Sequence, residues 1–167
     1  MELPEFRNEP FTDFSKPDQQ QAFAQALAKI ESTVLGRSWS CWIDGKEVKS
    51  TTTFTTHDPG ETTRSIGTFP QLTEADGNRA VEAAHAAFPK WADTPVEQRV
   101  QIFFEAAKRL RARKHEFSAM LCFEVGKSWA EADADTAEAI DFLEYYAGQM
   151  LRMAQPQPVT PVAGERN

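Results

Sequence analysis

Strand-like sequence is confined to one short stretch of this 167-residue chain, and that confinement most limits what it can fold into. Alternating and threonine-rich segments lie only between residues 39 and 69, where Asp44-Gly45 is typical of a two-residue hairpin turn. Elsewhere the apolar residues recur at the three- and four-residue spacing of helices. Because so few strands cannot form a closed sheet, the sequence predicts an α/β protein with an incomplete sheet.

The helical segments are delimited by recognisable end signals. A first helix is expected over residues 18–35, because its apolar residues share one face and Gly36 is a good C-cap. Thr73, with Asp76 three residues later, predicts the start of a helix that ends before Pro89. Between these two helices, strands are expected over residues 39–43, 46–48, 51–56 and 65–69.

Two further helices are predicted in the second half of the chain. The run TPVE at residues 94–97 combines an N-cap, a proline at the first helical position and a capping-box acid, so one long helix is expected from here to Gly126. Ser128 and Glu131 form another capping box, which opens a helix to about Met153. Three prolines then allow only an extended segment, for which this chain offers no partner strand.

Composition excludes several classes of function. A formal net charge of -7 argues against a general nucleic-acid role, which requires a basic surface. No stretch approaches the roughly 20 apolar residues of a membrane span, and the first residues lack the basic head and apolar run of a secretory leader. Cys41 and Cys122 form no CxxC pattern, so free thiols in a reducing compartment are expected. The sequence therefore predicts a cytoplasmic protein that binds neither nucleic acid nor membrane.

Known cofactor motifs are absent from the sequence. The eight glycines form neither GxGxxG nor a P-loop. His57, His85 and His115 lack cysteines or acids at zinc-ligand spacing. The basic segment KRLRARK at residues 108–114 is interpreted as the solvated face of a helix, with an anion or nucleotide site as the alternative.

Acidic residues dominate one segment, with seven acids against one base between residues 124 and 144. Glu131, Asp135, Glu138 and Asp141 are spaced by four and three, so they project near one face of the last helix. Three interpretations apply to this face. It is a solvated stripe, or a carboxylate-bridged metal site, which would need a histidine that the helix lacks. In the third, one carboxylate turns inward and holds a cationic group of a substrate.

Four motifs together resemble one enzyme family. They are EVGKSW at residues 124–129, AEAIDFLEYYA at 137–147, FRNEP at 6–10 and WIDGK at 42–46. These motifs resemble the aldehyde dehydrogenase superfamily and, within it, the L-glutamate γ-semialdehyde (1-pyrroline-5-carboxylate) dehydrogenases of proline catabolism. The likeness spans nearly the whole chain, and its most specific part is EAIDFxEYYA together with FRNEP.

The resemblance implies that the chain is the first part of a much longer enzyme. It assigns residues 1–17 to an N-terminal arm, 18–154 to the N-terminal part of the NAD-binding domain, and 155–167 to the start of an oligomerisation flap. The implied fold class is α/β, with helices and a small β-hairpin sheet and with the Rossmann core missing. The NAD site, the cysteine nucleophile and the general base would then lie beyond residue 167.

The resemblance also implies a substrate contact within the chain. Glu138 is expected to face the α-ammonium of the substrate at the mouth of an aldehyde tunnel, and Ala134, one turn earlier, to leave room for it. A carboxylate in a partly dry pocket pairs strongly with an ammonium and discriminates against aldehydes without one. Lys127 is given a structural role at the turn between the helices, and neither cysteine is implied to be the nucleophile.

Two functions therefore remain open. The first is the N-terminal fragment of an NAD-dependent L-glutamate γ-semialdehyde dehydrogenase, a homo-oligomer when full length, with the fragment itself inactive. The second is a stand-alone helical interaction module that is derived from an aldehyde dehydrogenase and has no catalytic role.

Overall fold

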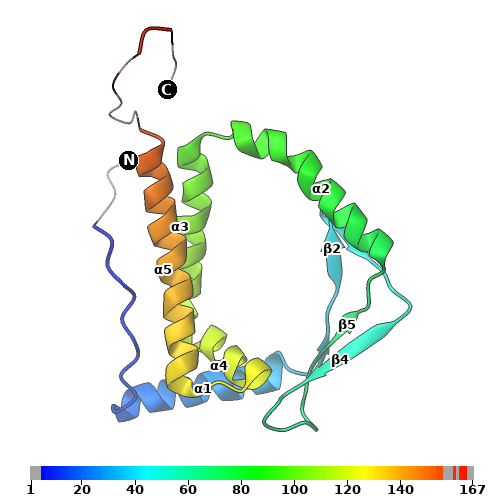
Figure 1. The fold of residues 1–167 in the computed structure, drawn as a ribbon. Helices are drawn as coiled ribbons and strands as arrows, with labels where there is room; N and C mark the ends of the chain where they lie inside the picture. Colours follow the sequence, from blue (N-terminus) through cyan, green and yellow to red (C-terminus); the bar gives the residue numbers. More distant parts are fainter. Residues whose placement is uncertain (1–4, 156–159, 161, 165–167) are drawn as a thin grey trace.

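The computed structural model describes residues 5–155, 160 and 162–164, which form five helices and two small sheets (Figure 1). In chain order the elements are α1 (Pro17–Thr33), β1 (Arg37–Ser38), β2 (Cys41–Ile43), β3 (Lys46–Val48), β4 (Thr53–His57), β5 (Ser65–Pro70), α2 (Glu74–Asp93), α3 (Val96–Ala112), α4 (Lys114–Val125) and α5 (Trp129–Met153). The five helices and two small sheets confirm the predicted class of helices with a small hairpin sheet.

The helices are arranged around α5, the acidic helix. α3 and α5 lie side by side, while α1 and α4 lie across one end of this pair (Figure 1). The N-terminal arm, here residues 5–16, runs along α5, and α2 arches from the strands back towards the start of α3 (Figure 1). The arrangement leaves α5 with one side packed and another side free of any described element.

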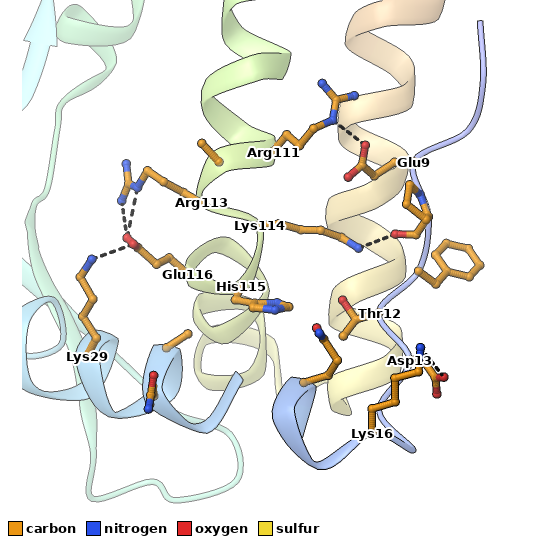
Figure 2. Close-up of a pocket in the computed structure, with 16 residues that line it drawn as sticks. Glu9, Thr12, Asp13, Lys16, Lys29, Arg111, Arg113, Lys114, His115 and Glu116 are labelled. Carbon is orange, nitrogen blue, oxygen red and sulfur yellow. Dashed lines mark hydrogen bonds and ion pairs between the residues drawn. The ribbon is translucent and has the colours of Figure 1, made fainter. Parts of the chain in front are cut away.

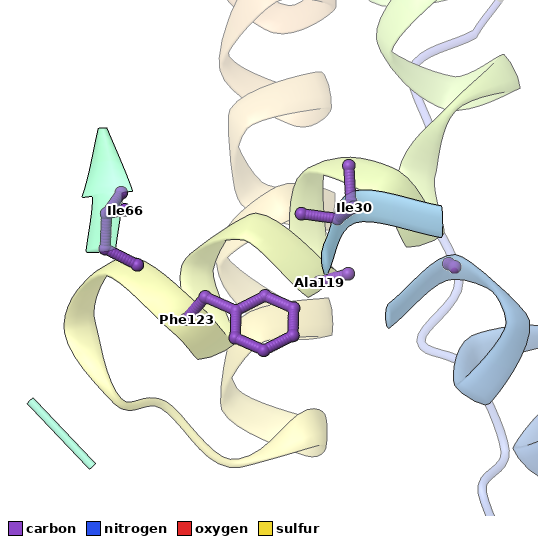
Figure 3. Packing of buried hydrophobic residues seen from close by; sticks show 5 residues of the cluster. Ile30, Ile66, Ala119 and Phe123 are labelled. Carbon is purple, nitrogen blue, oxygen red and sulfur yellow. The ribbon is translucent and has the colours of Figure 1, made fainter. Parts of the chain in front are cut away.

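Two clusters of buried apolar residues hold the helices together. In the first, Ile30 of α1 meets Ile66 of β5 and the side chains of Ala119 and Phe123 from α4 (Figure 3). The second lies between α3 and α5 and contains Val100, Ala147 and Leu151. Burial of apolar surface is the main favourable term in folding, so these clusters fix α5 relative to α3, and α4 relative to α1.

The strands form a hairpin and a separate three-stranded sheet. β2 and β3 pair antiparallel, and both turn residues have positive φ, 52° at Asp44 and 68° at Gly45, as a type I′ turn requires. In the other sheet the order is β1-β5-β4, with β4 antiparallel and β1 parallel to β5. The predicted hairpin is confirmed, whereas β1 is too short to have a sequence pattern of its own.

The predicted end of α2 before Pro89 is wrong, because the helix continues through the proline to Asp93. A proline inside a helix removes one hydrogen bond to the carbonyl four residues earlier. All of α2 lies within the described residues and none of them is buried, so water can solvate the freed carbonyl. The helix curves along its length in Figure 1, which is how an exposed helix accommodates such a residue.

The single helix predicted from residue 94 to Gly126 is also wrong, because it is divided at Arg113 into α3 and α4. Arg113 leaves the helical region, pairs with Glu116 and covers the Phe117 ring, which stabilises the corner. The two halves pack on different neighbours, and tertiary packing overrides local helix propensity. Thr94 does not cap α3: its hydroxyl donates to the Lys90 carbonyl and closes α2 instead.

The last segment of the chain is only partly described. Residues 156–159, 161 and 165–167 lie outside the described residues, and with them most of the extended segment predicted over 155–167. Val162, which is described, is about half exposed. The assignment of this segment to an oligomerisation flap therefore stays a prediction.

Candidate functional site

Asp133, close to the start of α5, is a carboxylate with only 1% of its surface exposed. Its two oxygens accept from Thr12, one from the backbone N–H at 2.7 Å and the other from the hydroxyl at 2.6 Å. The Lys114 ammonium lies 2.9 Å away and also donates to the Pro10 carbonyl. A buried charge is tolerated when it is paired and hydrogen-bonded in this way, so the arm, α4 and α5 are joined at this carboxylate.

The pKa of Asp133 reflects two opposed effects. Burial alone would raise the pKa, but the hydrogen bonds from Thr12 and the ammonium of Lys114 outweigh it, and the pKa lies below the usual value of aspartate. The group is therefore ionised at neutral pH, although water scarcely reaches it.

A second carboxylate of α5, Asp141, also binds the arm. One oxygen accepts from the Asn8 side-chain amide and the other from the Glu9 backbone N–H, both at 2.7 Å. Phe6 adds an edge contact with the Tyr145 ring, with centroids 5.2 Å apart. The segments FRNEP and EAIDFLEYYA, which are far apart in the sequence, are thus direct partners in the fold.

The basic segment 108–114 contributes to the same junction. The Arg111 guanidinium donates to Glu9 of the arm at 2.6 Å and to Glu144 of α5 at 2.8 Å. The hydrogen bond with Glu144, together with that to Glu9, raises the pKa of Arg111 above its ordinary value. The interpretation of this segment as a solvated face is wrong for Lys114, whose side chain is 11% exposed, whereas Lys108, Arg109 and Arg111 are exposed as expected.

A polar hollow of about 650 Å³ lies where the arm, α1 and the α3–α4 corner meet (Figure 2). Its cations already have carboxylate partners: Lys29 and Arg113 pair with Glu116, Arg111 with Glu9, and Lys114 with Asp133. Because each cation already faces a carboxylate, with Lys29 and Arg113 sharing that of Glu116, the hollow attracts a further anion less strongly. The alternative of an anion or nucleotide site is therefore not supported by the geometry of this hollow.

The remaining acids predicted on one face of α5 have separate environments. Glu131 completes the capping box of the helix with Ser128, and Asp135 pairs with Lys127. The structural role predicted for Lys127 at the turn agrees with this ion pair. Asp135 and Asp141 are partly exposed, in keeping with a solvated stripe, but each also has a partner within the chain.

Glu138 differs from its acidic neighbours. Its side chain is exposed, and among the described residues it makes no hydrogen bond or ion pair. Ala134, one turn earlier on the same edge of α5, is half-buried. The two residues predicted to contact a substrate are thus adjacent and accessible, and their role stays a prediction.

The face of α5 that carries Glu138 has acidic side chains in its first turns and exposed aromatic and apolar side chains further along. Continuing at helical spacing, the exposed side chains on this face are Phe142 (52%), Tyr145 (41%), Tyr146 (62%) and Met153 (71%). The opposite face is buried and largely apolar, apart from Asp133 and Thr136. A helix with apolar side chains on both sides is usually enclosed by protein. The exposed side of α5 therefore resembles a surface that packs against further polypeptide.

The described residues do not fit a nucleotide cofactor or a metal. The two helix N-termini with capping boxes, at Thr73 and Ser128, are already satisfied by their own side chains, and no glycine-rich loop precedes either. No group of three or more histidine, cysteine or acidic side chains in the described part of the chain could hold a metal ion. No described helix is both long and apolar enough to cross a membrane.

Sequence comparison places this chain beside enzymes of one kind. Residues 42–166 match the aldehyde dehydrogenase family. The 1-pyrroline-5-carboxylate dehydrogenase of Bacillus pumilus is 44% identical over 162 residues, which cover 97% of this chain and 31% of the relative. The 1-pyrroline-5-carboxylate dehydrogenase 2 of Bacillus subtilis is 41% identical with the same coverage. The chain thus spans about a third of the length of these relatives.

Solved structures of similar proteins have the same fold over this stretch. The 1-pyrroline-5-carboxylate dehydrogenase from Thermus with bound NAD superimposes with a TM-score of 0.89 at 38% identity, covering 98% of this chain and 32% of that chain. Proline utilization A from Bdellovibrio bacteriovorus gives a TM-score of 0.88 at 31% identity, covering 98% of this chain and 17% of that chain. The open architecture in Figure 1 is therefore the architecture that this stretch has within larger proteins.

Proposed function

This chain belongs to the aldehyde dehydrogenase family, and we propose that it is the N-terminal part of an NAD-dependent enzyme that oxidises L-glutamate γ-semialdehyde, in equilibrium with 1-pyrroline-5-carboxylate, to glutamate. The names of the Bacillus relatives support the substrate, and the NAD bound to the Thermus structure supports the cofactor. Identity above 40% over nearly the whole chain makes a shared substrate the simplest expectation.

The observation that carries the substrate class is the placement of Glu138. Its carboxylate has no described partner, and the exposed rings of Phe142 and Tyr145 lie on the same face of α5. When the remainder of the enzyme covers this face, the carboxylate is left in a site with little water. An ammonium then becomes a favourable partner, because charge-assisted hydrogen bonds are about twice as strong as neutral ones. The α-ammonium of glutamate γ-semialdehyde supplies that group.

The bond-making groups and the NAD site are assigned to the polypeptide beyond these residues. The described chain offers no cradle for a dinucleotide, and Cys122 lies inside α4 with its pKa raised by burial, which opposes thiolate formation. The purified 167-residue chain is therefore expected to form no NADH from NAD and the semialdehyde. Turnover by this chain alone would contradict the proposal.

The test of the substrate contact is the substitution Glu138→Gln in a complete enzyme, made by joining this chain to the remaining two-thirds of the Bacillus pumilus relative. Loss of the charge is expected to lower kcat/KM for the semialdehyde by about 10- to 100-fold, as for a hydrogen bond to a charged group. An aldehyde of similar size without an ammonium should be oxidised at an unchanged rate.

The matched control is Asp135→Asn, one turn away on the same helix, where the carboxylate pairs with Lys127. This variant should retain the preference for the semialdehyde. Equal losses for both aldehydes in the Glu138 variant, or an equal loss of preference in the control, would contradict the assignment of Glu138. A chimera that binds NAD but does not oxidise the semialdehyde would contradict the proposed substrate.

The role of Ala134 is tested by enlarging its side chain. Ala134→Leu is expected to raise KM for the semialdehyde, because the added volume occupies the room proposed for the substrate beside Glu138. The thermal unfolding of the 167-residue chain should change little, since Ala134 is only half-buried here. An unchanged KM would show that the substrate does not pass this position.

The assembly and the cellular location of the complete enzyme are also proposed from its family. We assign the complete enzyme to a cytoplasmic homo-oligomer, with residues 155–167 as the beginning of the segment that contacts another subunit. Sedimentation of the chimera with and without substitutions in this segment measures whether the segment contributes.

A further inference from the structure

The N-terminal arm crosses α5 in the opposite direction and is tied to it on both sides of Glu138. Asn8 and Glu9 bind Asp141, one turn after Glu138, and Thr12 binds Asp133, more than one turn before it. Figure 1 shows the arm running beside this part of the helix. The stretch of α5 that carries the proposed substrate contact therefore lies between two anchor points.

We propose that Asp141 is a positioning residue: by holding the arm at Asn8 and Glu9, it immobilises the segment of α5 that presents Glu138. The functional part of this inference rests on the function proposed above, whereas the mechanical part rests only on contacts within this chain. Asp141 itself is not expected to touch a substrate.

Hydrogen bonds to carboxylates, more than apolar packing, hold this part of the arm on α5. Phe11 is 72% exposed, and Phe6, although it meets the Tyr145 ring, is still 39% exposed, so apolar packing holds the arm only in part. The arm also has no regular secondary structure between residues 5 and 13 that could hold its shape. By contrast, both oxygens of Asp141 accept hydrogen bonds at 2.7 Å, and hydrogen bonds to a charged group are the stronger kind.

The position of Glu138 on α5 explains why such support matters. Its side chain lies on the free face, so no described neighbour restrains it directly. A binding group must be held within about 0.5 Å of its productive geometry by the elements that support it. Asp141 is three residues further along and adjacent on the helix surface, so the arm is the nearest support on that edge among the described residues.

The test begins with Asp141→Ala in the 167-residue chain, read by hydrogen–deuterium exchange of the amides in residues 134–141. Alanine has the highest helix propensity, so any loosening comes from loss of the arm and not from the helix itself. Exchange in this segment is expected to become at least about tenfold faster, as the lost ties to a charged group imply. Asp135→Ala, on the same helix without an arm contact, should leave it unchanged.

Two further variants keep the test decisive. Asn8→Ala removes one donor from an exposed arm residue, so folding is not at risk, and a smaller acceleration in the same segment is expected. The exchange of partners, Asn8→Asp with Asp141→Asn, restores a carboxylate–amide pair. The new side-chain carbonyl at position 141 still accepts from the Glu9 N–H, so protection should return. Unchanged exchange in both Asp141→Ala and Asn8→Ala, or equal acceleration in Asp135→Ala, overturns the inference.

Kinetics of the complete enzyme separate this inference from the proposed function. If both hold, Asp141→Ala raises KM for the semialdehyde, leaves kcat within about twofold, and does not change the oxidation of an aldehyde without an ammonium. If Glu138→Gln has no effect on substrate preference, the proposed function fails while the exchange result still decides the mechanical part. If Glu138→Gln acts but Asp141→Ala leaves KM unchanged, the positioning role fails and the substrate contact stands.

Discussion

Replacing Asp133 with asparagine tests whether the buried junction between the arm, α4 and α5 is a major source of stability. The substitution keeps the size of the side chain but removes the charge that faces Lys114, whose side chain is only 11% exposed. One of the two oxygens is also replaced by an amide donor, which cannot accept from Thr12 or Lys114.

The expected loss is about 3 kcal/mol in the free energy of unfolding at pH 7. Breaking a buried ion pair by removing one partner costs roughly 3–5 kcal/mol, and the lower end applies because Lys114 keeps its bond to the Pro10 carbonyl. The control Asp135→Asn breaks a pair whose side chains are 37% and 40% exposed, so its loss should stay below about 1 kcal/mol. Urea unfolding followed by circular dichroism measures both losses.

The pH dependence gives a second test of the same carboxylate. The pKa of Asp133 is lower in the folded chain than in an unfolded one, so the ionised group stabilises the fold at pH values above about 4. This contribution is lost as the pH falls through the folded pKa. The stability difference between wild type and Asp133→Asn should therefore be full at pH 7 and shrink below about pH 4. A difference under about 0.5 kcal/mol at pH 7, on the order of a surface substitution, or one that stays constant into acid, refutes the reasoning.

Two further substitutions and one thiol-labelling reaction test other parts of the fold. Arg64→Met leaves the carboxylate of Asp58, which is 5% exposed, without its guanidinium partner, so thermal unfolding should report a loss of about 2 kcal/mol. Gly126→Ala places a side chain at φ 69° and should lower the free energy of unfolding by about 1 kcal/mol in the same assay. Burial raises the pKa of the Cys122 thiol, so in a Cys41→Ser background iodoacetamide should label it more slowly than it labels glutathione at about pH 8, near an ordinary thiol pKa.

The local elements were predictable wherever short-range chemistry determines them. The hairpin follows from Asp44-Gly45, whose residues adopt the positive φ that a two-residue turn requires. The capping boxes at Thr73 and Ser128 open α2 and α5 as expected, because their hydrogen bonds lie within four residues. Where long-range packing decides, prediction failed, as at Arg113, where the chain turns although no proline or glycine marks the corner.

The junction of the arm was not predictable from charge patterns alone. The sequence does not show that Asn8 and Thr12 of the arm bind α5 more than 120 residues away. One signal did exist. FRNEP and EAIDFLEYYA were the two most specific parts of the resemblance, and they turn out to contact each other through Asp141 and Tyr145. Two motifs that are both specific to one family are therefore candidates for segments that contact each other in the fold.

The two sides of α5 show why carboxylate side chains can have different roles along one helix. Asp133 is surrounded by protein, so its charge is held by fixed donors and its pKa is set by this chain. Glu138 is exposed here, and an ion pair in water contributes little. In the proposed enzyme, the interaction energy of Glu138 with an ammonium would therefore depend on how fully further polypeptide covers this face of α5. It follows that an ammonium compound should bind weakly to the 167-residue chain and selectively to the complete enzyme, even though the carboxylate belongs to this chain in both cases.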